Sequence, residues 1–122
     1  MADEKSSIYK VAIASTDGES VNLHYGKADK FFIYQIDDET GYDLLEERQT
    51  EPACLGGSHD NAKMEESVMR LTDCRYVVAA RIGRGAGAVL AAKGITGMEL
   101  PGSADDALLK VWKYNRIQGL FN

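Results

Sequence analysis

The chain has 122 residues, of which 44% are hydrophobic, and its 14 Lys and Arg against 19 Asp and Glu give a formal net charge of −5. This length fits one compact domain with a real core. The acidic balance argues against nucleic acid as the main partner, because phosphate binding needs clustered Lys and Arg, but it leaves room for a small anionic ligand. No apolar run approaches the roughly 18 residues of a membrane span, so we expect a cytoplasmic protein.

The first half of the chain predicts a leader and three strands. Residues 1–7 are expected to be a disordered leader, with residues 8–122 forming a single domain. Residues 8–15 ("IYKVAIAS") are almost continuously apolar, which is typical of a buried central strand. Residues 30–37 and 42–50 predict two more strands, and Gly41 between them provides the turn of a β-hairpin.

The second half alternates helices and strands. The pattern predicts a helix at 58–71, a strand at 74–80, a helix that ends at Gly94, a short strand at 97–100 and a final helix from near Ser103. Ser58 is a plausible N-cap of the first helix, and Asp60 in its first turn suits the helix dipole.

The element order is therefore β-β-β-α-β-α-β-α. Helices that alternate with apolar strands indicate parallel βαβ units with right-handed crossovers, whereas the hairpin adds antiparallel strands. The sequence thus predicts an α/β fold: a mixed five-stranded sheet in a three-layer α/β/α domain.

The segment "TEPACLGGSHDN" at residues 50–61 carries two ligand-type side chains. Cys54 lies in a loop, and a thiolate is a soft ligand for iron, copper, zinc or a metal–sulfur cluster. His59 lies at the start of the predicted helix, where it could ligate a metal or donate to an anion. The alternatives are an inert loop cysteine and a solvated first-turn histidine.

Two other residues of the same types differ in their expected surroundings. His24, in "VNLHYGKADKFF", lies in the loop between the first two strands, where it is either a ligand or a loop histidine stacked on Tyr25. This loop and the loop of Cys54 can converge at one edge of the sheet. Cys74 begins the fourth strand, and we expect it to be buried on the face of Tyr76 and Val78 with a structural role.

The turn "RIGRGAGA" follows a strand and opens a helix. Gly83, Gly85 and Ala88 fit the pattern G-x-G-x-x-A of a dinucleotide-binding loop, but the motif comes too late in the chain to complete a βαβαβ half. Two interpretations stay open. The turn is either a cradle of backbone N–H groups for an anion, flanked by Arg81 and Arg84, or a site of close helix–strand packing.

Taken together, these segments resemble the dinitrogenase iron–molybdenum-cofactor-binding family, which includes NifX, the core domain of NafY, the C-terminal domain of NifB and the orange protein of sulfate reducers. The most specific segments are the pattern H-[FY]-G-x-A-x-x-F, here "HYGKADKF" at residues 24–31, and the turn "IGRGA" at residues 82–86. The resemblance covers about residues 8–115. Tyr25 stands where phenylalanine is commoner in the family.

The resemblance implies a ribonuclease H-like fold without nuclease activity. It also implies a small, non-enzymatic carrier that holds the iron–molybdenum cofactor or a related anionic metal–sulfur cluster, with nitrogenase or cofactor-assembly proteins as partners. His24 and the turn of Gly83, Arg84 and Gly85 match the family's motifs, so they are expected to bind the cluster.

Cys54 and His59 join this expected site from the residue-based argument, which makes His24, Cys54 and His59 the expected metal ligands. Two alternatives belong to other classes. One is a nucleotide- or phosphate-binding regulatory domain that uses Gly83, Gly85 and Gly87. The other is a protein-docking domain that holds no cluster.

Overall fold

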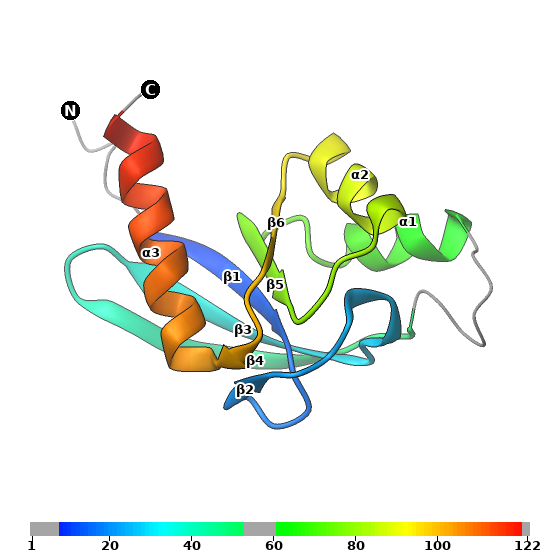
Figure 1. Cartoon of the computed structure of the whole chain (residues 1–122), viewed down its shortest axis with the longest axis horizontal. Coiled ribbons are helices and arrows are strands. Elements are labelled where there is room, and N and C mark those ends of the chain that lie inside the picture. The colour runs from blue at the N-terminus through cyan, green and yellow to red at the C-terminus, as the bar shows by residue number, and fades with distance from the viewer. Residues whose placement is uncertain (1–7, 53–60, 121–122) are drawn as a thin grey trace.

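The computed structural model describes residues 8–52 and 61–120, and this part of the chain contains a mixed five-stranded sheet (Figure 1). Its order is β4-β3-β1-β5-β6. The strands are β1 (Ile8–Ala14), β3 (Lys30–Asp37), β4 (Gly41–Gln49), β5 (Tyr76–Ala79) and β6 (Thr96–Glu99). β1, β3 and β4 pair antiparallel, whereas β1, β5 and β6 run parallel. The predicted hairpin and mixed sheet are confirmed.

Helices cover both faces of this sheet. On one face, α1 (Asn61–Met69) and α2 (Arg84–Ala92) enclose a core that includes Phe31, Leu71 and Leu90. On the other face, α3 (Ala104–Leu120) packs Leu108 and Val111 onto the sheet. Figure 1 shows α3 on one side of β5 and β6 and the other two helices on the opposite side. The α/β architecture is therefore as predicted, with three layers.

The helix boundaries follow from local chemistry. The Ser103 hydroxyl accepts the backbone N–H of Asp106 at 3.0 Å, so Ser103 caps α3 where the sequence predicted its start. Gly94, with φ of 79°, follows the end of α2 as the predicted left-handed glycine. Ser58 and Asp60, expected at the start of the first helix, lie outside the described residues, as does the predicted leader at residues 1–7.

Two small elements were not predicted. β2 (Ser20–Val21) pairs antiparallel with β7 (Gly102–Ser103), and a 3-10 helix, η2 (Tyr25–Lys27), follows His24. Two-residue strands show no hydrophobic period, so the sequence carried no signal for them. They matter because they hold in place the connecting segment between β1 and β3, and this segment carries His24.

The prediction for the face of Cys74 is wrong. The residue is buried, 3% exposed, but its side chain joins the core under α1 and α2, whereas Tyr76 and Val78 point to the α3 face. The physical reason is that β5 begins only at Tyr76, so the alternation of strand side chains does not extend back to Cys74.

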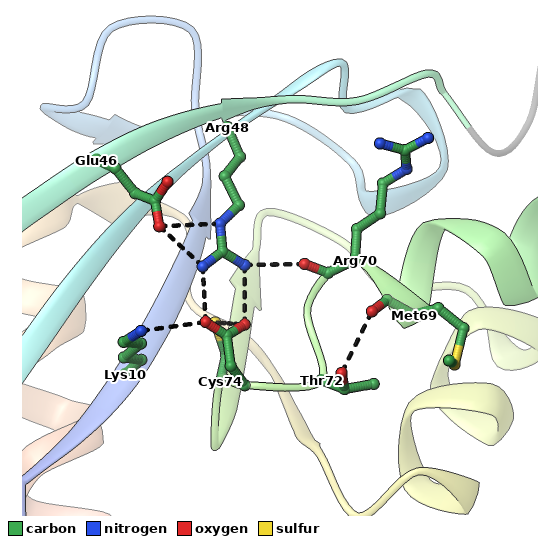
Figure 2. A network of polar contacts seen from close by, with 8 residues as sticks. Lys10, Glu46, Arg48, Met69, Arg70, Thr72 and Cys74 are labelled. Atoms are coloured by element: carbon green, nitrogen blue, oxygen red, sulfur yellow. Dashed lines mark hydrogen bonds and ion pairs between the residues drawn. The ribbon is translucent and has the colours of Figure 1, made fainter.

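A polar cluster fastens the edge strand β4 to the turn before β5 (Figure 2). Arg48 Nη1 and Nη2 lie 2.8 and 2.7 Å from the two carboxylate oxygens of Asp73, and Nη1 also donates to the carbonyl of Arg70. Lys10 Nζ contacts the same carboxylate at 3.2 Å, and Glu46 contacts Arg48 at 2.9 Å. Because β4 is largely exposed, this cluster links it to the turn before β5, while β3 joins the hairpin to the rest of the sheet through its pairing with β1.

Candidate functional site

His24 lies beside the end of β5, where the glycine turn begins. It forms an isolated parallel bridge with Arg81. The bridge is held by two backbone hydrogen bonds, from the Ala80 N–H to the Leu23 carbonyl at 2.9 Å and from the Tyr25 N–H to the Arg81 carbonyl at 2.8 Å. The His24 side chain is exposed, so its imidazole is accessible next to the turn.

Tyr25 anchors this segment in the core. Its ring is 1% exposed and packs against Phe31 at a centroid distance of 5.6 Å. Its hydroxyl lies 2.6 Å from the Ser67 hydroxyl of α1, and burial raises the pKa of Tyr25. The turn that carries His24 is therefore tied both to the end of β5 and to α1.

The glycine turn begins α2. Gly83 is its N-cap residue, with φ of −69° and ψ of 166°, and its carbonyl accepts the first helical hydrogen bond, from Gly87 at 2.9 Å. The N–H groups of Arg84, Gly85 and Ala86 precede that bond, so they have no partner within the helix. A Cβ atom built on Gly83 or Gly85 would meet nothing within 4 Å. Close packing therefore does not explain these two glycines, and the alternative of a packing role does not apply to them.

The two sides of the turn differ in charge. On the β1 side lies His24, whereas on the β6 side the Glu99 carboxylate accepts the Ile82 N–H at 2.7 Å. Arg81 and Arg84 are exposed and bring positive charge to the turn. An anion therefore meets a carboxylate if it approaches from β6 but not if it approaches from His24.

A hollow of about 700 Å³ lies on the β6 side, between α2 and β6. It is bordered by the turn, by α2, by β6 and by the residues between them: Ile82, Gly83, Arg84, Gly87, Ala91, Gly94, Ile95, Thr96, Gly97 and Glu99. Its volume is in the usual range of small-molecule sites. His24 is not among the residues that border it, so the hollow and the histidine are separate features of one turn.

Cys54 and His59 lie outside the described residues, but the flanks of their segment are placed. Thr50 donates its N–H to the Asp29 carbonyl at 2.9 Å, directly after the turn of His24. On the other flank, Ser67 of α1 contacts Tyr25. The flank before the segment thus lies close to the turn that carries His24, and the helix after it contacts that turn through Ser67.

Cys74 is not a candidate ligand. Burial, and secondarily the neighbouring Asp73 carboxylate, raise the pKa of its thiol to about 12, which keeps it protonated at neutral pH. Among the described residues, no cluster of three or more His, Cys, Asp or Glu side chains could hold a metal ion. Also in this part of the chain, no helix is long and apolar enough to cross a membrane.

Sequence reasoning missed the ways in which the site is held: the Tyr25–Ser67 hydrogen bond and the Glu99 contact with Ile82. The only available signal was the tyrosine at position 25, where the resemblance favours phenylalanine. Its extra hydroxyl needed a buried partner, but no sequence rule places that partner at Ser67, 42 positions away.

Comparisons with known proteins find a matching family and relatives that agree with one another. The model of a family described as dinitrogenase iron-molybdenum cofactor matches residues 7–114. The FeMo cofactor biosynthesis protein NifB of Chlorobaculum tepidum is 32% identical over 111 residues, which cover 90% of this chain and 25% of that protein. NifB of Klebsiella pneumoniae is 36% identical over 78 residues, which cover 60% of this chain and 16% of that protein. The chain thus spans a quarter or less of these two relatives.

Solved structures share the fold. An NMR structure of a Thermotoga protein with a provisional NifB designation has a TM-score of 0.59 and 23% identity, covering 88% of this chain and 90% of that one. A crystal structure of a Methanocaldococcus jannaschii protein, provisionally designated a dinitrogenase, has a TM-score of 0.58 and 14% identity, with coverage of 88% and 90%. The ribonuclease H-like motif stays a prediction.

Proposed function

The chain belongs to the dinitrogenase iron-molybdenum cofactor family, and we propose that it is a non-enzymatic carrier of the iron–molybdenum cofactor or a related anionic metal–sulfur cluster. The cluster is its cargo. The relatives are named as FeMo cofactor biosynthesis proteins, and the proposal extends that context to this chain.

The observation that carries the proposal is the bridge between His24 and Arg81. It holds an accessible imidazole next to the start of α2, where backbone N–H groups without helical partners meet Arg84. Imidazole is a ligand for iron, and the N–H groups with the positive helix end attract anions. One turn therefore combines a metal ligand with a cradle for negative charge.

The open space at Gly83 and Gly85 supports this assignment. A Cβ at either position would meet nothing within 4 Å, so the fold itself does not require glycine there and the space beside the start of α2 is open to a ligand. The cluster would approach from the His24 side, because Glu99 repels an anion on the β6 side. His24 would bind a metal atom, and the N–H groups with Arg84 would bind the anionic edge of the cluster.

Cys54 and His59 complete the proposed ligand set through their chemistry and through the placement of their flanks. Thiolate is the common ligand of metal–sulfur clusters. The segment that carries both residues departs from Thr50, which bonds to Asp29 close to His24. The proposed metal ligands are therefore His24, Cys54 and His59.

The decisive experiment mixes the purified chain anaerobically with isolated iron–molybdenum cofactor, removes the free cofactor by gel filtration, and measures iron and molybdenum per protein. We expect a coloured complex that is lost in the double variant His24→Ala/Cys54→Ala. Arg84→Ala should weaken binding, whereas Lys93→Ala, at the far end of α2, is the matched control. Absence of a complex, or full binding by the double variant, contradicts the proposal.

A nucleotide or phosphate ligand is the second candidate, favoured by the 700 Å³ hollow next to Gly83 and Gly87. The Glu99 carboxylate counts against it, because it already occupies the Ile82 N–H and faces the same side. Calorimetric titration with ATP and NAD separates the candidates. Micromolar binding of ATP or NAD that is unaffected by His24→Ala/Cys54→Ala would favour the nucleotide. If neither the cluster nor a nucleotide binds, the result would favour a docking domain that holds no cluster.

A further inference from the structure

An apolar surface lies along one flank of α3 and continues onto the edge strand β4. Leu109, Trp112 and Leu120 recur on this flank at helical spacing, and Leu109 and Leu120 are 47% and 80% exposed. Tyr42 of β4 borders the same hollow as Leu109 and is 40% exposed, and Leu44, two residues on along the same face of the strand, is 52% exposed. Figure 1 shows the β3–β4 hairpin extending past α3, with no helix of the described chain above it.

Two hollows make this surface a groove. One, of about 240 Å³, lies between the hairpin and α3 and is bordered by Asp38, Tyr42, Leu109 and Trp112 among others. The other, of about 270 Å³, is bordered by Trp112 and by residues of the next turns, including Arg116 and Leu120. Because both hollows border Trp112, they lie one after the other along the same flank of the helix.

The groove has opposite charges at its two ends. Asp37 and Asp38 border the hairpin end, whereas Lys113 and Arg116 border the end near Leu120. From residue 107 to residue 120, α3 carries three cationic residues and no carboxylate, although the whole chain has a net charge of −5. Within the described part of the chain, Lys113 forms no ion pair, and the Arg116 guanidinium only stacks on Trp112 at 5.2 Å.

Asp38 provides an independent observation. One of its carboxylate oxygens is buried and has no hydrogen-bond partner among the described residues. Because this oxygen is buried, as is the unpaired Tyr9 hydroxyl, a cation from outside can reach only the other oxygen of the carboxylate, which no described cation contacts in an ion pair. The acidic end of the groove therefore lacks a cation, and the basic end supplies two.

We propose that this groove is a two-fold interface between two copies of the chain. In a two-fold interface the same surface meets itself in reverse, so the acidic end of one copy faces the basic end of the other. With α3 antiparallel to its equivalent and the axis between Trp112 and Lys113, Leu109 lies opposite Arg116 of the second copy, next to the hollow that Asp38 borders. Arg116 of the second copy then approaches Asp38.

The charge pattern favours a second copy over a membrane, because an anionic lipid surface would be repelled by Asp37 and Asp38. The interface is small. The flank from Leu109 to Leu120 is about 16 Å long at the rise of an α-helix. We therefore expect weak association, with a Kd of about 10–100 μM, since stable interfaces bury about 800 Å² per partner.

Sedimentation equilibrium over a range of protein concentrations tests the interface. The expected result is a mass that rises from monomer to dimer with concentration, and less so at high salt. Arg116→Glu and Asp38→Lys should each weaken association by about tenfold or more, and the double reversal Asp38→Lys/Arg116→Glu should restore it to within about threefold of the unchanged chain. Lys93→Glu, directly after α2, is the control with the same change in charge.

Leu120→Ser keeps the test decisive if a charge variant fails to fold, because this side chain is largely exposed and its loss should weaken association without unfolding the chain. A chain that stays monomeric at the highest concentration overturns the proposal. The same holds if Arg116→Glu has no more effect than Lys93→Glu. Binding of a monomeric chain to vesicles of phosphatidylserine and phosphatidylcholine would assign the groove to a membrane and also overturn it.

Discussion

The hydroxyl groups of Tyr25 and Ser67 lie 2.6 Å apart in the core and join the turn of His24 to α1. Either hydroxyl can donate in this pair. Tyr25 is 1% exposed and Ser67 is 7% exposed, so neither hydroxyl can turn to solvent without a rearrangement. The contact therefore holds the proposed cluster ligand His24 in place before any ligand binds.

Tyr25→Phe removes this hydrogen bond and leaves the Ser67 hydroxyl unpaired in the core. We expect the free energy of unfolding to fall by about 1 kcal/mol. Ser67→Ala should cost a similar amount, but the double variant should cost less than the sum, because the second change removes a group that is already unpaired. Urea unfolding of the four proteins measures this coupling. Strict additivity would contradict the contact.

The Arg48–Asp73 ion pair predicts a dependence of stability on pH. First the Arg48 hydrogen bonds and then Lys10 hold the pKa of Asp73 well below its usual range. The folded state therefore favours the carboxylate, and this contribution is complete above the unfolded pKa of about 4 and is lost as the pH falls below it. Since Asp73 is 42% exposed, solvent screening limits the contribution to about 1 kcal/mol.

Asp73→Asn should thus lower the free energy of unfolding by about 1 kcal/mol at pH 7, and the difference from the unchanged chain should shrink steadily below about pH 4. Urea unfolding at a series of pH values measures it. Glu47→Gln, which removes the more exposed pair with Lys30 at 3.1 Å, is the control and should cost less. A difference that stays constant down to pH 2 would show that the carboxylate charge is irrelevant.

Cys74 should be an unreactive thiol in the folded chain. Burial raises its pKa to about 12, from an ordinary value of 9.0, so the thiolate fraction at pH 8 falls by about a thousandfold. In a Cys54→Ser variant, Cys74 is the single cysteine, and its reaction with a disulfide reagent reports on it alone. We expect slow labelling in buffer and fast labelling in denaturant. Equal rates in both conditions would contradict the burial.

Much of the fold could be predicted because apolar runs, apolar residues at helical spacing and turn residues mark most of its strands and helices. Strand β1, the hairpin and the helix stop at Gly94 all agree with local rules for burial, turns and left-handed glycine. The Cys74 face was wrong because the strand begins two residues later than its apolar pattern suggests. The polar contacts that fasten the fold, such as Arg48 with Asp73, join residues far apart in the chain and have no local signal.

The candidate site, too, has residues that the sequence predicts and contacts that it does not. His24 and the glycine turn were predicted as ligands from residue types and from the resemblance, and the backbone bridge to Arg81 brings them side by side, while their role as ligands stays a prediction. Glu99 was not predicted, because its contact with Ile82 depends on the parallel pairing of β5 and β6. Local patterns supply the chemistry of a site, whereas the sheet decides which groups meet there.

Gly85 and Gly97 should respond in opposite ways to alanine. A Cβ on Gly97 would lie 3.0 Å from Ile82 Cδ1 and 3.2 Å from Leu90 Cδ1, so Gly97→Ala forces these side chains to shift at a cost of about 1–2 kcal/mol. A Cβ on Gly85 meets nothing within 4 Å, and alanine is the better helix former, so Gly85→Ala should leave stability unchanged or raise it by up to about 1 kcal/mol.

Thermal and urea unfolding of the two alanine variants measures this contrast in stability. Cluster binding by the same two variants then shows whether the glycine turn itself takes part in binding. Gly97→Ala displaces Ile82, whose N–H bonds to Glu99, so the start of the glycine turn should move as well. Gly85→Ala adds only a methyl group beside the proposed anion cradle. A folded Gly85→Ala chain that binds less cluster would therefore place the defect at the turn itself, whereas equal destabilisation by both changes would contradict the open space at Gly85.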